Sequence, residues 1–345
     1  MLCMSHQRWS IYRMLVSSLY IWSILAFPSR WTKIAARGLL TPSPIHVAAK
    51  SIFRLDSHQH RSTTENKGVL RSEAAASSSP SSLSSSSSSS LPVPEVYMED
   101  IRKFLGPESK ANALIEHFHI QGWRWHTKSL VRDAGRLHRL ALKSDVTNAE
   151  TLKDATDYVV GFNLLGLHKI EETLFFPWMR EKLTSVPKKE LSSAFSYVMD
   201  KLENDRRTVD HLGRIISRNA LLACDTNQPE SDRSNAIIEV ADRSAQLQDC
   251  ARGMMYIEDK WLVPAIADIV PEKEQKSFNN KVLRKLGLLD SRLHLVGMYE
   301  AIIEEDDDDS TKEQELFQRA IPSISRQLIP RWKRKLYEPK TYMLE

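Results

Sequence analysis

The chain has 345 residues, enough for two domains, and a formal net charge of +4 at pH 7. Its first 55 residues contribute seven basic side chains and no acidic one, so the remainder carries a net charge of −3. A mildly acidic body gives no case for nucleic-acid binding. The three cysteines, Cys3, Cys224 and Cys250, share no short spacing. The sequence therefore signals neither a disulfide framework nor a cysteine-type zinc site, and Cys224 and Cys250 are expected to be buried free thiols.

Residues 1–70 are predicted to target the chain to an organelle. Arg8 and Arg13 precede an apolar run from Met14 to Phe27. This run is about half the length of a comfortable membrane span and is typical of a signal-peptide core. The basic stretch that follows lacks acids, as transit peptides do. The junction Leu-Ala-Phe-Pro at residues 25–28 resembles the signal-to-transit boundary of proteins sent to plastids of secondary origin in algae. A plastid is therefore favoured, a mitochondrion is the alternative, and a retained anchor ranks third.

Residues 71–95 are predicted to form a disordered linker. The stretch from Ser77 to Ser90 is almost pure serine and is followed by Leu-Pro-Val-Pro. Such a segment cannot bury enough apolar surface to offset the entropy lost on ordering.

Residues 96–290 are predicted to form an all-α domain, because glycines are few and apolar residues recur at helical spacing. The four main helices are expected at residues 111–143, 148–183, 188–223 and 231–269. Short connections between long helices favour antiparallel neighbours and hence an up-down-up-down four-helix bundle. Residues 291–345 differ in character and are predicted to be a C-terminal tail.

One pattern occurs twice in this helical region. Residues 168–177 and 255–264 both follow the pattern [His/Met]-x-Ile-Glu-[Glu/Asp]-x4-Pro. His168 and Glu172 are four residues apart and share a helix face, as a nitrogen and a carboxylate must to bind one metal ion. Glu171 is an alternative partner. The second copy keeps its acid at Glu258 but has Met255 in place of the histidine.

Counting residues from the predicted turns places further side chains at the level of His168. His126 and His168 are equally distant from a turn near Thr147, so they come level in an antiparallel pair. His138 would lie about 18 Å away along the axis, which indicates a structural role. On the third helix, His211 lies about two turns beyond the expected level, and Asp205 is nearer.

The two Ile-Glu-[Glu/Asp]-x4-Pro segments and the sequence Trp-Arg-Trp-His ending at His126 resemble a hemerythrin-type HHE cation-binding domain, over about residues 110–270. The resemblance implies a four-helix bundle that holds two non-haem irons through histidines and bridging carboxylates. Family roles include oxygen carriage, oxygen or iron sensing, and metal storage. Carried onto this sequence, the implied ligands are His126, His168, Glu171 or Glu172, His211 and Glu258.

The sequence also departs from the family pattern. The family places a histidine four residues before the first acid of each pair, where this chain has Leu167 and Met254. The remaining donors suit one iron in a two-histidine, one-carboxylate arrangement better than two irons. We expect binding of iron, and of dioxygen through it, or sensing, rather than catalysis, because no substrate pocket or catalytic base can be identified. The alternative is a metal-free four-helix interaction module, and an oxidase ranks third.

The targeting hypothesis predicts the fate of a fusion protein. A fluorescent reporter placed after residues 1–70 should enter a plastid or a mitochondrion, because this stretch supplies the basic, acid-poor leader. Fluorescence microscopy of the source cell type measures the outcome. A reporter that stays diffuse in the cytosol contradicts the hypothesis.

Overall fold

A computed structural model describes residues 93–304 and 308–345, with the side chains of 288, 289 and 308–310 left out of the description. The described residues belong to one compact unit. The described residues are helical and contain no strand, so the predicted all-α class is confirmed. The leader and nearly all of the serine-rich linker lie outside the described residues. In the described part, no helix is long and apolar enough to cross a membrane.

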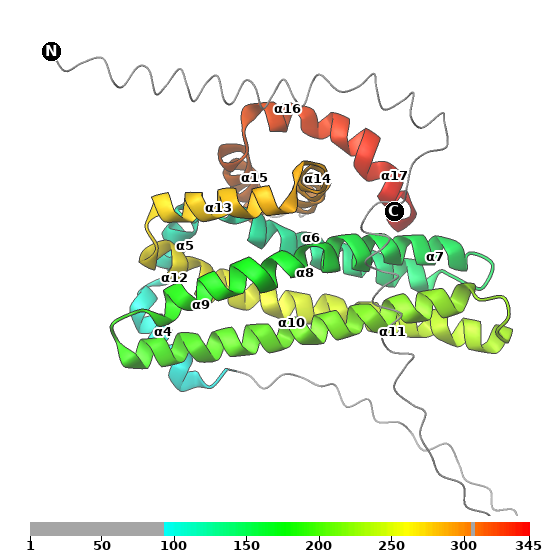
Figure 1. Cartoon of the computed structure of the whole chain (residues 1–345), viewed down its shortest axis with the longest axis horizontal. Coiled ribbons are helices and arrows are strands. Elements are labelled where there is room, and N and C mark those ends of the chain that lie inside the picture. Colours follow the sequence, from blue (N-terminus) through cyan, green and yellow to red (C-terminus); the bar gives the residue numbers. More distant parts are fainter. Residues whose placement is uncertain (1–92, 305–307) are drawn as a thin grey trace, which may run out of the picture. The chain divides into compact units, whose positions relative to one another are not determined.

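The amino-terminal part of the described chain is made of long helices joined by short turns (Figure 1). The helices before the turn at residues 143–148 are α4 (Glu95–Leu105), α5 (Glu108–Glu116) and α6 (Gln121–Leu142). The second long segment is built from α7 (Ala149–Thr156), η1 (Asp157–Leu164), α8 (Leu165–Ile170), η2 (Glu171–Phe175) and α9 (Phe176–Thr184). It is followed by α10 (Lys189–Cys224), α11 (Glu230–Ile257), η3 (Glu258–Leu262) and α12 (Val263–Ile269). The elements η1, η2 and η3 are π-helical turns.

Shorter helices complete the chain. They are α13 (Glu272–Leu286), α14 (Leu288–Glu304), α15 (Asp308–Ala320), α16 (Ser323–Trp332), η4 (Lys333–Tyr337), α17 (Glu338–Thr341) and η5 (Tyr342–Leu344). Residues 288–345 are called the C-terminal segment below. The boundary expected at residue 290 falls inside α14. That helix packs on α6, with Val296 and Ile302 fully buried.

Three of the four long helical stretches lie close to the predicted ranges, whereas the first is divided. The range 111–143 contains the end of α5, a break at residues 117–120, and α6. The side-chain amide of Gln121 donates to the carbonyl oxygens of Ile115 at 2.8 Å and Phe118 at 3.0 Å. This side chain satisfies carbonyl groups that a continuous helix would have bonded to its own backbone.

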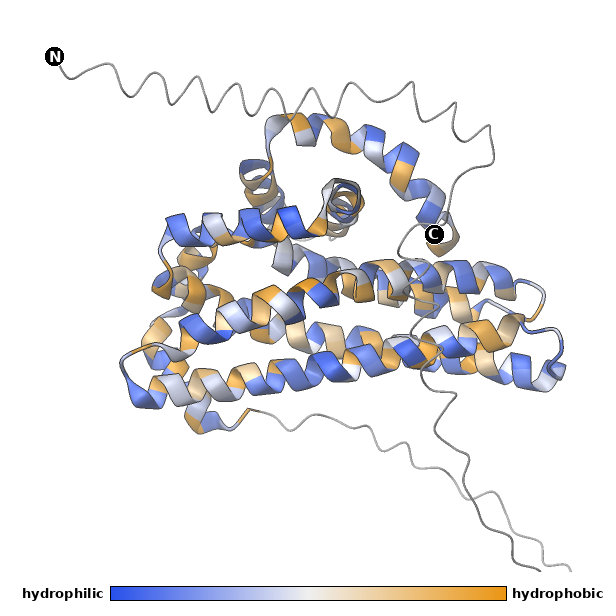
Figure 2. Cartoon of the chain, in the orientation of Figure 1, coloured by the Kyte–Doolittle hydropathy of each residue, from blue (hydrophilic) through white to orange (hydrophobic). Residues whose placement is uncertain are grey.

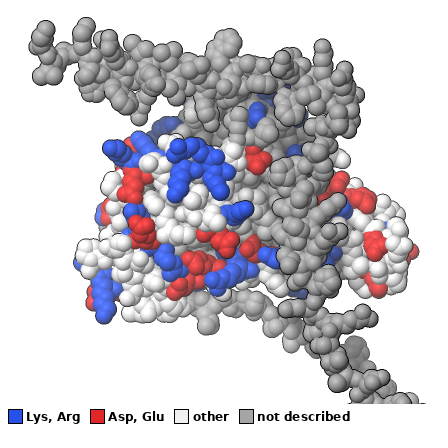
Figure 3. Space-filling model, in the orientation of Figure 1, with Lys and Arg blue, Asp and Glu red and all other residues white. Residues whose placement is uncertain are grey.

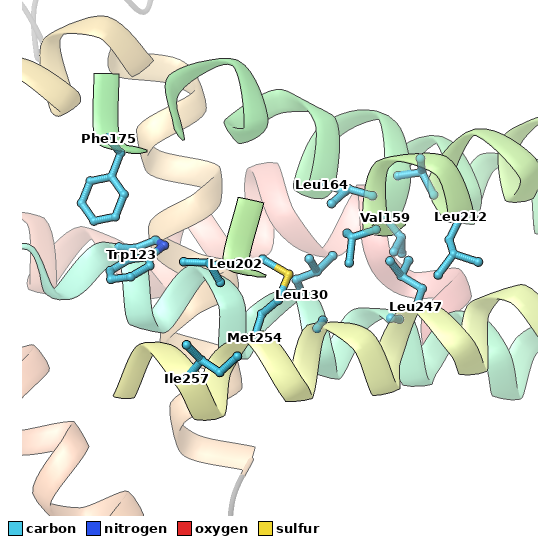
Figure 4. Close-up of a cluster of buried hydrophobic side chains, with 14 of the residues drawn as sticks. Trp123, Leu130, Val159, Leu164, Phe175, Leu202, Leu212, Leu247, Met254 and Ile257 are labelled. Carbon is cyan, nitrogen blue, oxygen red and sulfur yellow. The ribbon is translucent and has the colours of Figure 1, made fainter. Parts of the chain in front are cut away.

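The core is formed along α11, which packs against both α6 and α10. Figure 4 shows Leu130, Leu202 and Met254 meeting from these three helices. All three side chains are buried. Met254 therefore behaves as a core residue, as methionine at helical spacing usually does. Colouring by hydropathy shows polar residues on the outer side of α13 (Figure 2), and both signs of charge are interspersed on the face drawn in Figure 3.

Matched truncations on α10 test this core. Leu202 is fully buried and Leu221 is 43% exposed. Leu202→Ala should lower the free energy of unfolding by about 2–5 kcal/mol, because it leaves a cavity. Leu221→Ala should change it by less than about 1 kcal/mol. Urea titrations followed by circular dichroism measure both, and equal losses would contradict the packing described.

Cys224 and Cys250 are free and partly buried, in keeping with the expected free thiols. Burial raises the pKa of the Cys224 thiol from 9.0 to about 11, and the charge of Glu150 acts in the same direction.

This shift predicts slow alkylation of Cys224 in the folded protein. Iodoacetamide reacts with the thiolate, and a pKa higher by about two units leaves about 100-fold less thiolate at pH 8. Peptide mapping by mass spectrometry should show Cys224 modified far more slowly in the folded chain than in urea. The folded rate should also keep rising to about pH 11, whereas a plateau near pH 9 would contradict the shift.

Candidate functional site

His126 lies on α6 and is 3% exposed. Its Nε2 lies 2.9 Å from the carbonyl oxygen of Asn163. A carbonyl has no proton to give, so Nε2 donates and Nδ1 keeps its lone pair. That Nδ1 lies 3.8 Å from Oε1 of Glu171. Burial lowers the pKa of His126 more than the charge of Glu171 raises it, so the ring is neutral at pH 7.

His168 lies on α8 and is 6% exposed. Its Nδ1 is hydrogen-bonded to the carboxylate of Asp210 on α10. Burial alone would raise the pKa of Asp210, but the hydrogen bond and charge of His168 outweigh it and hold that pKa below its usual value. The carboxylate is therefore ionised and accepts the hydrogen bond from Nδ1–H. The other ring nitrogen, Nε2, lies 3.8 Å from Oε2 of Glu171.

Glu171 thus lies between the two imidazoles, with its side chain 12% exposed. Glu258, from η3, is 1% exposed. Its Oε2 accepts a hydrogen bond of 2.9 Å from the hydroxyl of Thr127, and its Oε1 has no hydrogen-bond partner among the described residues. Burial raises the pKa of Glu258 well above its usual value, and the nearby charge of Glu171 raises it further. His126, His168, Glu171 and Glu258 are called the His–Glu cluster below.

Both glutamates of the cluster begin a π-helical turn. In each turn a backbone N–H bonds to the glutamate carbonyl five residues earlier, from Phe176 to Glu171 and from Val263 to Glu258. A proline follows one residue later, at 177 and 264. Proline has no N–H and its ring clashes with the carbonyl four residues before it, so a wider turn accommodates it. The repeated pattern in the sequence therefore encodes two wide turns, each beginning with an acid.

Two of the predicted ligands lie outside the cluster. His211 is exposed on α10, and its neighbour Asp210 is the residue that reaches His168. The side chain of Glu172 is 69% exposed and lies 3.6 Å from Arg206. Successive residues on a helix point about 100° apart, so one position decides which side chain faces inward.

Three other side chains that the sequence singled out have local partners. Asp205 accepts from Lys201 at 2.8 Å and is not part of the cluster. Nδ1 of His138 lies 2.9 Å from the carbonyl oxygen of Ala241, which agrees with the structural role expected of it. Met255 is partly buried.

Besides Asp210, two further groups near the cluster were not found from the sequence. His294, on α14, is 4% exposed, and burial holds its pKa well below the usual value. Its ring stacks on Phe162 at 4.2 Å and meets His126 edge to face at 5.8 Å. The other group is Asp133, which is fully buried and accepts a hydrogen bond of 2.8 Å from the Asn163 side chain. The sequence offered no signal for His294, because it follows the predicted bundle.

The imidazole nitrogens and carboxylate oxygens of the cluster are suitable ligands for a borderline cation such as ferrous iron. Each imidazole donates one N–H to a fixed acceptor and directs the other nitrogen toward Glu171, as metal-binding histidines do. The unpartnered Oε1 of Glu258 is a further oxygen donor. As the side chains stand, no three His, Cys, Asp or Glu groups in the described part of the chain are placed so that they could hold a metal ion. Binding would therefore require rotation of the glutamate side chains.

The cluster is enclosed by helices. Two surface hollows of about 320 and 610 Å³ lie elsewhere, and none of the four cluster residues lines either of them. No family model, curated protein or solved structure matches this chain. The chemical interpretation of the cluster therefore depends on its own geometry.

Proposed function

We propose that this chain is a hemerythrin-like protein that binds non-haem iron at the His–Glu cluster. In this proposal the four long helical stretches form an up-down-up-down bundle around the ion, and the protein binds or senses iron or dioxygen. His126 and His168 would hold the iron through their free nitrogens, with Glu171 and Glu258 as carboxylate ligands. The bound iron would supply a dioxygen-binding centre. With this donor set, one ion is favoured over two. The site would operate in a plastid or, alternatively, a mitochondrion.

One observation carries the proposal. Two buried imidazoles from different helices each have one nitrogen bonded to a fixed acceptor and the other within 3.8 Å of the same carboxylate. Ligand atoms about 2 Å from a shared ion lie roughly 3–4 Å apart, so these separations suit a bound cation. They are longer than an ordinary hydrogen bond, so direct bonding between these groups does not account for the arrangement.

A metal-free helical interaction module is the second candidate. It is favoured by the absence of a ready three-ligand group among the described residues and by the buried, protonated form expected for Glu258. In that case the cluster is a polar patch of the core, and the two histidines contribute only through packing and hydrogen bonds.

Iron binding by matched histidine variants separates the two candidates. Ferrous iron added without oxygen should bind the full chain and raise its melting temperature, because a ligand bound only by the folded state stabilises it. His168→Ala should reduce bound iron at least about tenfold, since one ligand lost costs more than about 1.4 kcal/mol. Iron content and the visible spectrum after exposure to oxygen measure binding.

The control is His138→Ala, because His138 is a partly buried histidine whose ring is bonded to a backbone carbonyl and which lies outside the cluster. It should lower stability without lowering the amount of iron bound. If iron neither binds the unaltered chain nor raises its melting temperature, the metal-free module is the correct candidate.

A further inference from the structure

The C-terminal segment contacts the residues on both sides of the His–Glu cluster. It lies outside the span that resembles a metal-binding domain, yet α14 packs directly on α6. A Cβ atom at Gly297 of α14 would lie 3.2 Å from Oγ of Ser129 and 3.5 Å from the Tyr337 ring. This close approach brings α14, α6 and η4 together one turn from His126.

A hydrogen-bonded chain connects Tyr337 to His126. The Tyr337 hydroxyl accepts from Arg132 on α6. Arg132 also donates two hydrogen bonds, of 2.7 and 2.9 Å, to Oδ1 of the fully buried Asp133. Oδ2 of Asp133 accepts from the side chain of Asn163, and the carbonyl of Asn163 accepts from His126. Each member fixes the next, so the chain constrains which nitrogen of His126 is protonated.

A second connection extends from Glu313 on α15 to the glutamate side of the cluster. Glu313 accepts from Arg124 at 3.0 Å and from Lys128 at 2.7 Å. Arg124 is 8% exposed and also donates to both carboxylate oxygens of Asp259, at 2.5 and 3.2 Å. Asp259 directly follows Glu258 in η3. Glu313 therefore holds the arginine that fixes the turn carrying Glu258.

We propose that Tyr337 and Glu313 are positioning residues of the His–Glu cluster, through which the C-terminal segment orients His126 and Glu258. The aromatic contact between His294 and His126 acts in the same direction. Docking of the segment and binding of an ion are then coupled: each strengthens the other by the same factor, because linkage is reciprocal. The coupling to iron rests on the proposed function, whereas the orientation of His126 does not.

The test compares Tyr337→Phe and Glu313→Gln with the controls Tyr342→Phe and Glu315→Gln in the full chain. Tyr342 is 65% exposed and Glu315 is exposed, and each is the same residue type as its counterpart. Nitrogen NMR of the imidazoles in the metal-free protein reports the tautomer of His126. Titration with ferrous iron gives the affinity. Amide hydrogen exchange of peptides from 288–345 reports docking with and without iron.

We expect a single Nε2–H tautomer of His126 in the unaltered chain and in both controls. In Tyr337→Phe, the His126 signal should shift or broaden because the Asn163 carbonyl is less firmly held. Either positioning variant should weaken iron binding about 3- to 10-fold, as expected from the loss of one hydrogen bond of ordinary strength. Saturating iron should slow exchange in the C-terminal segment of the unaltered chain, and this slowing should be smaller in Tyr337→Phe.

Other outcomes separate the two proposals. If the unaltered chain binds iron but the variants match their controls in His126 signal, affinity and exchange, the positioning role is wrong and the iron site stands. If the unaltered chain binds no iron but Tyr337→Phe alters the His126 signal, the iron proposal fails and the positioning role stands. A variant that only lowers the melting temperature, with the His126 signal unchanged, has a general structural role and contradicts our proposal.

Discussion

Burial of ionisable side chains between helices is the constraint on which the arrangement of this protein depends. A buried polar atom without a partner costs about 1–3 kcal/mol, so each such group must meet another at the correct depth and angle. Two wide turns, at Glu171 and Glu258, help to achieve this. Each turn accommodates a proline within a continuing helix. The acidic side chain of its first residue points into the interior.

A third π-helical turn before a proline occurs in the C-terminal segment. The π-helical turn η4 begins at Lys333, six residues before Pro339, just as η2 and η3 begin six residues before Pro177 and Pro264. In η4 the turn ends at Tyr337, whose hydroxyl accepts from Arg132. Proline position thus decides where each helix widens, and the widened turns supply polar side chains to the interior from three separate stretches.

The fold could be predicted from the sequence to the extent that its signals are local. Apolar periodicity and helix-breaking residues locate the turns, and the long helical stretches lie within a few residues of their predicted ends. The break before α6 was missed because it depends on one side chain, that of Gln121, which bonds to the carbonyls of the preceding helix.

In the candidate site, residue counting brought His126 to the level of His168, because helical rise is nearly constant over a short hairpin. On α10 it offered His211 and Asp205 and missed Asp210, since small errors in phase accumulate along the 36 residues of this helix. The position of His294 could not be predicted from any local pattern, because only the tertiary packing of α14 brings its ring to His126.

The electrostatics of the cluster bear on the choice between the two candidate functions. Burial raises the pKa of Glu258 well above the usual value, and the nearby charge of Glu171 raises it further. This shift favours the protonated form of Glu258, and its Oε1 has no hydrogen-bond partner among the described residues. In a core that served only for packing, the Oε1 atom would be destabilising, because a buried polar atom without a partner costs free energy. A cation between the two carboxylates would replace the proton and supply the partner that Oε1 lacks. The glutamate pair is thus costly in a metal-free module and useful in a metal-binding one, and this asymmetry makes iron binding the first function to test.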